Sequence, residues 1–305
     1  SVQPLSELEV KAELLYNRIP FSKILFMINL SLGVLSFLLL LHNSLQRNTL
    51  SPKAKTISRT AETFFSVALY LAFIFHLAGY CLRWYIGGRI PLSNGYETMQ
   101  FMALYILLIA CLLHRRFPFI LPFGFLLSGF ALLVSYLGQM NPQITPLMPV
   151  LVSPWLSIHV SLIMMSYALL AFIMLNGILA LCLRKKESEN NVSGNDAIQD
   201  NRIEQLTLVS RLLLYPATFF LGAGIFLGAV WANVSWGRYW AWDPKEVWAL
   251  ITFLVYGVAF HSQSLRIFRK PLFFHIYMIL AFLTVLMTYF GVNYVLGGMH
   301  SYANA

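Results

Sequence analysis

Charged residues are scarce in this chain. Only 11% of its 305 residues are Asp, Glu, Lys or Arg, whereas 58% are hydrophobic and the mean hydropathy is +0.69. The water-facing surface of a soluble domain needs far more charge than this. A soluble fold is therefore excluded, and the composition predicts an all-α, polytopic membrane protein that folds in a lipid bilayer.

Cysteine is also rare, with single residues at Cys81, Cys111 and Cys182 and no Cys-x-x-Cys or Cys-x-x-Cys-His sequence anywhere. All three lie within apolar stretches, where a cysteine usually acts as a small packing residue. The sequence thus offers no thiol chemistry and no covalent heme attachment site of its own.

Apolar stretches long enough to cross about 30 Å of hydrocarbon as helices occur eight times. They are residues 23–42, 64–84, 97–113, 117–137, 156–183, 214–232, 246–265 and 272–293. We therefore expect about eight transmembrane helices. An even number of spans places both chain ends on the same side of the membrane.

The net charge of +9 does not indicate a nucleic-acid partner, because the basic residues are sorted by loop. If the loops after the first, third, fifth and seventh spans are cytoplasmic, they hold twice as many Lys and Arg residues as the opposite side. The positive-inside rule then predicts that both termini and the loop between the sixth and seventh spans are external.

Four segments are expected along the chain. Residues 1–22 form an external N-terminal segment without a signal-peptide core, and the start at Ser rather than Met is expected for a piece of a longer fused protein. Residues 23–184 hold the first five spans. Residues 185–213 form a polar cytoplasmic linker, with a short amphipathic interfacial helix at 202–213. Residues 214–305 contain the last three spans.

Tryptophan is concentrated in one loop. Of seven in the chain, five lie at Trp231, Trp236, Trp240, Trp242 and Trp248. One or two at a membrane boundary are ordinary anchors. Five of them, with Gly237 and Asp243 in the pattern Trp-Gly-x-x-Trp-x-Trp-Asp, predict an aromatic platform for a large flat apolar ligand with a polar edge.

The sequence Asp243-Pro244-Lys245-Glu246 predicts how the helix after this loop begins. Asp at the N-cap, Pro at the first helical position and Glu at the third make a capping box. A fixed helix start would hold the preceding loop rigid, so that Trp236, Trp240 and Trp242 present their ring faces to one ligand.

Three of the seven histidines stand out by position. His159 lies at the outer end of the fifth span, His300 follows the eighth, and His261 lies in the seventh near its cytoplasmic side. Most single histidines are merely polar residues with a partner, but imidazole is a common axial ligand of heme iron. A histidine within the hydrocarbon region is a functional candidate. For His261 the sequence does not choose a partner between His76 and His275.

The residues from Trp236 to Asp243 resemble the WWD motif of the heme-handling membrane proteins of cytochrome c biogenesis. The expected external loop from Arg83 to Glu97 (RWYIGGRIPLSNGYE) is similar to the signature of the CcsA, or system II, members. His159, His261 and His300 fall where that family has its histidines. The resemblance covers about residue 60 to the end.

This resemblance implies transport of heme b to the external face and its presentation to apocytochrome c for thioether attachment at Cys-x-x-Cys-His. Such a holocytochrome c synthase, or heme lyase, works together with CcsB. His159, His300 and His261 would be iron ligands. The porphyrin would contact Trp231, Trp236, Gly237, Trp240, Trp242, Asp243 and Trp248. The expected location is the bacterial inner membrane, or the thylakoid membrane of a plastid.

Residues 4–21 also resemble the junction of fused CcsBA proteins, in which a CcsB half comes first and supplies the second transmembrane iron ligand. Two alternatives stay open. A pure heme carrier would lack synthase activity, although such relatives have a shorter or much larger span layout. A b-type heme electron-transfer subunit would place paired histidines on facing transmembrane helices.

Overall fold

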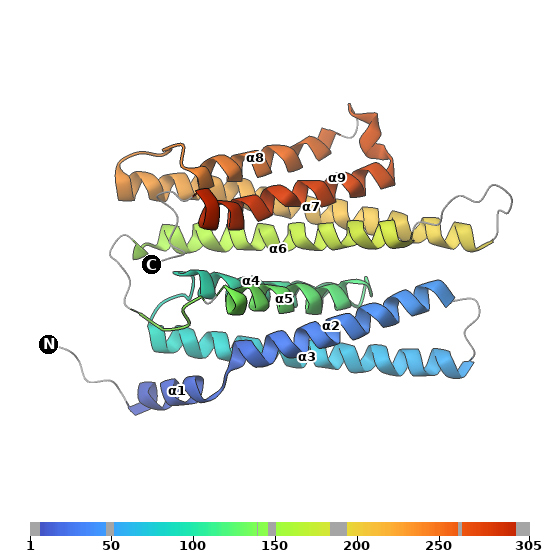
Figure 1. The fold of residues 1–305 in the computed structure, drawn as a ribbon, viewed down its shortest axis with the longest axis horizontal. Coiled ribbons are helices and arrows are strands. Elements are labelled where there is room, and N and C mark those ends of the chain that lie inside the picture. The colour runs from blue at the N-terminus through green and yellow to red at the C-terminus, as the bar shows by residue number, and fades with distance from the viewer. Residues whose placement is uncertain are drawn as a thin grey trace. The chain divides into compact units, whose positions relative to one another are not determined.

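The computed structural model describes residues 7–46, 52–138, 140–145, 151–183, 194–261 and 264–296. Within these ranges all regular structure is helical (Figure 1), which confirms the all-α prediction. The chain divides into two compact units, Ser1–Leu151 and Val152–Ala305. Each unit is described by itself.

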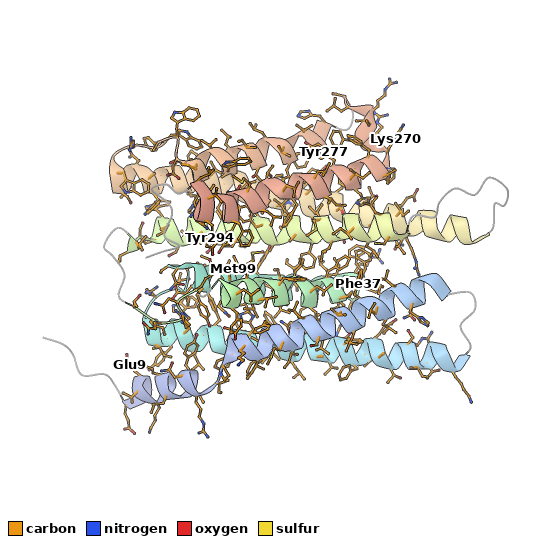
Figure 2. The ribbon with its side chains drawn as sticks, viewed as in Figure 1. Glu9, Phe37, Met99, Lys270, Tyr277 and Tyr294 are labelled. Atoms are coloured by element: carbon orange, nitrogen blue, oxygen red, sulfur yellow. The ribbon has the colours of Figure 1, made fainter. Side chains whose placement is uncertain are left out.

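The first unit contains five helices: α1 (Glu7–Arg18), α2 (Phe21–Gln46), α3 (Pro52–Gly87), α4 (Gly95–Leu113) and α5 (Ile120–Leu137). From α2 to α5, consecutive helices run antiparallel (Figure 1). Helix α5 packs against both α2 and α4. Glycines allow this approach: a Cβ at Gly33 of α2 would lie 2.9 Å from the Leu126 side chain, and one at Gly129 of α5 would lie 2.8 Å from Leu30. Figure 2 shows the side chains that fill the spaces between the helices.

The second unit contains α6 (Pro154–Leu183), α7 (Gly194–Trp236), α8 (Pro244–Val258) and α9 (Pro271–Leu286). Two 3₁₀ turns, η2 (Ala259–His261) and η3 (Arg266–Arg269), lie between α8 and α9, and a π-helix, η4 (Met287–Leu296), continues α9. Helix α6 packs along α7 and α9, and α8 packs against α7, α9 and η4. Trp231, Tyr256 and Phe274 are among the largest fully buried side chains.

The predicted spans largely correspond to observed helices. Seven helices among the described residues are long and apolar enough to cross a membrane. The exception is the predicted span 246–265, because α8 has only 15 residues, or about 22 Å. The three residues of η2 add about 6 Å, which brings the helical length close to the hydrocarbon thickness. The expectation that this helix reaches residue 265 was therefore wrong.

The boundary expected between a linker and the sixth span is also different. Residues 184–193 lie outside the described residues, but 202–213 are part of the single helix α7 and not a separate interfacial helix. Leu206, Val209 and Ser210 are each no more than 1% exposed. The amphipathic pattern arises because one face of α7 packs against protein rather than lying on a membrane surface.

A buried ion-pair network lies where α3 leads into α4. Arg83 and Glu97 are 2% and 1% exposed, and Nη2 of Arg83 donates to Oε1 of Glu97 at 2.9 Å. The second carboxylate oxygen accepts hydrogen bonds from Arg89 at 3.3 Å and from the backbone N–H of Ser93 at 2.8 Å. Arg83 also donates to the Pro142 carbonyl at 2.6 Å. Glu97 thereby joins two loops of the first unit.

Replacing Glu97 by Gln is expected to destabilise the protein by about 3 kcal/mol or more, because it leaves the buried Arg83 guanidinium without its counter-charge. Denaturant unfolding of the detergent-solubilised protein measures this. The matched control is Lys11→Gln, which breaks the exposed Lys11–Glu7 pair of α1 and should change little. Equal effects of the two substitutions would contradict the role assigned to Glu97.

Candidate functional site

The tryptophan loop is the segment 237–243 between α7 and α8. Helix α7 ends after Trp236 because Gly237 adopts a positive φ of 73°, and its N–H donates to the Asn233 carbonyl at 2.9 Å. This is the usual way in which a glycine stops a helix. The chain therefore turns abruptly after Trp236.

The other end of the loop is fixed by the predicted capping box, which the structure confirms. The Asp243 carboxylate accepts the Lys245 N–H at 3.1 Å, and the Glu246 carboxylate accepts the Asp243 N–H at 3.2 Å. Asp243 is only 5% exposed. The loop is thus anchored to the first turn of α8 by two side chain to backbone hydrogen bonds.

The five tryptophans play different structural roles. Trp231 is 1% exposed and packs edge-on against Trp236, with ring centroids 5.0 Å apart. Trp240 and Trp242 lie 6.0 Å apart with an interplanar angle of 88°, and Trp242 is 75% exposed. Trp248 is half-buried in the second turn of α8. Because two rings are perpendicular, a flat ligand that stacks on Trp242 would meet Trp240 side-on in this arrangement.

His159 is held between α6 and α7. Its Nδ1 lies 2.6 Å from the Gly224 carbonyl oxygen, which only accepts hydrogen bonds, so Nδ1 carries the proton and Nε2 carries the lone pair in the neutral ring. A Cβ on Gly228 would lie 2.7 Å from Cε1 of this ring. The imidazole therefore fills a notch that Gly228 leaves open. Such an Nδ1–H bond to a carbonyl is the usual means of orienting a metal-binding histidine.

The glycines of this notch were missed by the sequence analysis. The signal was present as Gly224 and Gly228 four residues apart on one face of α7, a spacing that permits close helix approach. The partner histidine could not be identified from that spacing, because it lies 65 residues away from Gly224 in the chain.

The other predicted iron ligands are placed differently. His300 lies outside the described residues. His261 is the last residue of η2, beyond the end of α8, and its side chain is exposed. It is thus not enclosed within a transmembrane α-helix bundle, as the prediction of a span to 265 had implied.

The two alternatives for a partner of His261 are both buried and hydrogen-bonded through Nε2. His275 is fully buried, and its Nε2 lies 2.9 Å from Oγ1 of Thr207. The Thr207 hydroxyl donates to the Ile203 carbonyl at 2.7 Å, so it accepts the hydrogen bond from His275. His76 is 2% exposed, with its Nε2 3.0 Å from the Gln100 amide oxygen. In each case Nε2 is thus hydrogen-bonded within its own unit.

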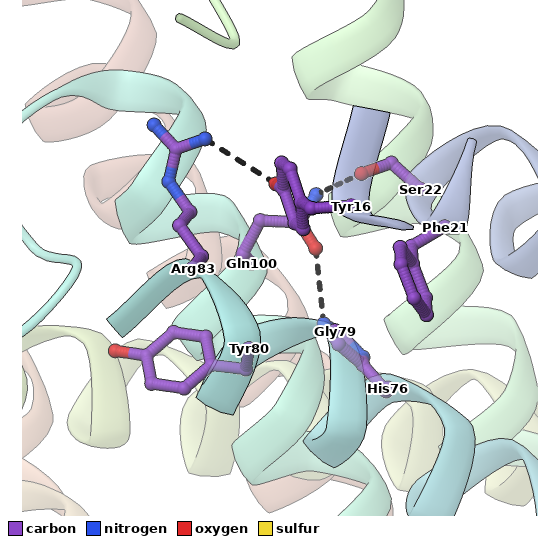
Figure 3. Close-up of a pocket in the computed structure, with 8 residues that line it drawn as sticks. All are labelled: Tyr16, Phe21, Ser22, His76, Gly79, Tyr80, Arg83 and Gln100. Carbon is purple, nitrogen blue, oxygen red and sulfur yellow. Dashed lines mark hydrogen bonds between the residues drawn. The ribbon is translucent and has the colours of Figure 1, made fainter. Parts of the chain in front are cut away.

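His76 borders a small cavity in the first unit (Figure 3). Its volume is about 10 Å³, enough for one water molecule and far too small for a porphyrin. Around it, Gln100 donates to Ser22 at 2.6 Å and Arg83 donates to Tyr16 at 3.3 Å. The residues that line it are Tyr16, Phe21, Ser22, His76, Gly79, Tyr80, Arg83 and Gln100. His76 therefore belongs to the polar core of this unit.

Comparison with known proteins places the tryptophan loop, His159, His261 and His300 inside one matched region. The family described as "Cytochrome C assembly protein" matches residues 92–300. "Protein NrfI" of Wolinella succinogenes is 37% identical over 298 residues, which cover 98% of this chain and 32% of that protein.

Two proteins described as "Cytochrome c biogenesis protein CcsA" are also similar. The one from Chlamydomonas reinhardtii is 37% identical over 232 residues, which cover 72% of this chain and 63% of that protein. The one from Prochlorococcus marinus strain NATL1A is 32% identical over 311 residues, which cover 89% and 93%. The chain thus spans about a third of the first relative and less than two thirds of the second.

We expect Gly228→Ala to lower the free energy of unfolding by about 1–3 kcal/mol, because the new methyl group overlaps the His159 ring. Denaturant unfolding in detergent measures this. Gly257→Ala on α8 is the matched control, since a Cβ there meets nothing within 4 Å. The loss should disappear when His159→Ala accompanies Gly228→Ala. An equal loss in both backgrounds would mean that the imidazole does not occupy the notch.

Proposed function

This chain belongs to the cytochrome c assembly protein family as a CcsA-type member with a role in cytochrome c maturation, and on that premise we propose that it presents heme b for covalent attachment to apocytochrome c. Heme is here a substrate, carried to the external face of the membrane. The observation that carries the proposal is the His159 imidazole, whose Nδ1–H donates to the Gly224 carbonyl at 2.6 Å.

The first step is iron coordination. A hydrogen bond from Nδ1 to a carbonyl raises the basicity of Nε2 and fixes the ring direction. His159 is half-buried, and its Nδ1–H bond to Gly224 restricts the rotation of its ring. His300 is proposed as the second axial ligand, which would make the iron six-coordinate. Gly228 and Trp236 share helix α7, with Trp236 about 12 Å further along its axis and directly before the tryptophan loop.

The second step is porphyrin orientation. An indole that is 75% exposed, as in Trp242, offers a face for stacking, and Trp240 stands perpendicular to it. Aromatic pairs favour both offset-stacked and edge-to-face contacts. In the proposed complex one ring stacks on the macrocycle and the other limits its sideways movement. The vinyl edge then faces the incoming Cys-x-x-Cys-His segment.

The third step is the reaction. Each cysteine S–H adds across one vinyl C=C: a C–S bond forms, and the hydrogen goes to the neighbouring carbon. No leaving group or oxidant is needed. The histidine of the segment displaces one axial ligand of the carrier. The chain contributes positioning and coordination without a nucleophile of its own.

The route across the membrane is proposed to begin at His261. Its exposed side chain in η2 is accessible to a partner, and we propose that a CcsB segment supplies the second iron ligand there. His76 and His275 are not proposed for this role, because each ring is buried within its own unit, at 2% and 0% exposure, whereas His261 is exposed. The bilayer is proposed to be a bacterial inner membrane or a thylakoid membrane.

His159→Gly should abolish covalent heme attachment to a co-expressed apocytochrome c and be partly rescued by added imidazole, which replaces the missing ligand. Absorption spectra of the purified His159→Gly protein, recorded as isolated and after dithionite, should lack the bis-histidine heme b signature. The same loss is expected for the double variant His159→Ala with His300→Ala. His42→Gly, at an exposed site of α2, is the control. Bound heme with an unchanged spectrum and no rescue would contradict axial ligation.

His261→Ala and His275→Ala should have opposite signatures. The exposed His261 contributes little to packing, so its loss should leave the unfolding midpoint unchanged and reduce the heme that co-purifies when CcsB is co-expressed. His275→Ala removes a buried hydrogen bond to Thr207 and should cost about 1–3 kcal/mol of stability. A stability loss in His261→Ala without any change in heme content would refute the proposed transmembrane site.

A further inference from the structure

Trp242 has an unfavourable backbone conformation. Its φ is 58°, and it is the single non-glycine residue with a positive φ in the part of the chain that the structure describes. For an L-residue this region costs about 1–2 kcal/mol, and a tryptophan has no local hydrogen bond to offset the cost as Asn or Asp would. Because its side chain is 75% exposed, extensive packing does not account for the conformation either. A backbone contact must stabilise it.

Glu246 supplies that contact. Its Oε2 accepts the N–H of Ala241 at 2.8 Å and the N–H of Asp243 at 3.2 Å. These two residues lie on either side of Trp242, so a single oxygen atom holds the backbone before and after it. A capping box requires only the bond to Asp243, the N-cap residue. The bond to Ala241 is the shorter of the two, and helix capping does not explain it.

The indole is also restrained from one side. The Trp240 ring lies 6.0 Å away at 88°, within the range of edge-to-face contacts. Glu246 therefore sets the backbone of Trp242, and Trp240 limits where its ring lies. Nonglycine residues held at strained positions by their surroundings cluster at functional sites.

We propose that Glu246 is a positioning residue that holds Trp242 in the left-handed conformation and so presents its indole to the porphyrin. This inference rests on the proposed function, in which Trp242 stacks on heme. Without the carboxylate, Trp242 returns to a negative φ, which turns its side chain away from the present direction. Loss of the Glu246 carboxylate thus changes where the Trp242 ring lies and leaves the number of aromatic rings in the loop unchanged.

A fluorine NMR experiment tests the positioning without heme. The full chain is labelled with 5-fluorotryptophan in detergent, and the Trp242 signal is identified as the one absent from Trp242→Phe. Glu246→Ala should shift or broaden that signal, whereas Glu246→Gln should preserve it, because the amide oxygen still accepts both N–H groups. Glu204→Ala, at an exposed glutamate of α7, is the control and should leave the signal unchanged.

Glu246→Asp controls for the possibility that Glu246→Ala acts by destabilising the first turn of α8. It keeps a carboxylate in the first turn of α8 but is one methylene too short to reach both N–H groups, so the same shift is expected. Circular dichroism should be unchanged in this variant. A Trp242 signal that stays in place in both Glu246→Ala and Glu246→Asp would overturn the proposal, whether or not the protein binds heme.

Hemin titration then tests the consequence for the ligand. Glu246→Ala and Trp242→Ala should each weaken hemin binding by about threefold to tenfold, the range expected for one aromatic contact. The double variant should bind no more weakly than Trp242→Ala alone, because Glu246 acts through that ring. If the double variant instead loses affinity by the product of the two single losses, Glu246 does not act through Trp242 and the positioning role is overturned. A wild-type chain that binds no hemin would refute the proposed function and leave the fluorine result to decide on Glu246.

Discussion

One carboxylate oxygen, Oε2 of Glu246, joins the tryptophan loop to the first turn of α8. The first N–H groups of any helix have no partner inside it, and here the side chains of Asp243 and Glu246 provide partners. At the opposite end of the loop, Gly237 stops α7 by its positive φ. The seven residues of the tryptophan loop, 237–243, are therefore fixed at both ends. Trp242 can stay exposed because the backbone on either side of it, at Ala241 and Asp243, is held by hydrogen bonds to Glu246.

The histidines differ in burial and in the hydrogen bonds that their ring nitrogens make. His76 and His275 are buried with Nε2 engaged, and releasing either would break a buried hydrogen bond worth about 1–3 kcal/mol to its partner. His159 donates from Nδ1 to the Gly224 carbonyl at 2.6 Å, which orients the ring. His261 is exposed in a 3₁₀ turn. Burial thus separates the structural histidines from the candidate ligands more clearly than sequence position does.

Local physics explains which predictions were confirmed. Hydropathy identifies the helices because each apolar run must match the thickness of the bilayer, and the capping box is readable because its residues lie within three positions. The error at residues 202–213 arose where distant segments meet. The face of α7 that carries Ser210 is buried against protein, as its bond from Asn176, 34 residues away, illustrates. The partners of His76 and His275 lie 24 and 68 residues away, beyond any local pattern.

The two signature segments of this chain use the same local device. Asn94-Gly95-Tyr96-Glu97 and Asp243-Pro244-Lys245-Glu246 each place an N-cap residue three positions before a glutamate. In both, that glutamate accepts backbone N–H groups of the preceding loop: Ser93 for Glu97, and Ala241 with Asp243 for Glu246.

The two carboxylates differ in the groups that they bind. Glu97 is buried and holds two arginines, so its loop is committed to the stability of the first unit. Glu246 holds only backbone groups in the bonds described above, and its loop displays an indole. A carboxylate that accepts hydrogen bonds from peptide N–H groups fixes a loop through its backbone. The side chains of that loop are then not needed for the contact. That distinction lets the loop with Trp240 and Trp242 keep its aromatic surface for a ligand.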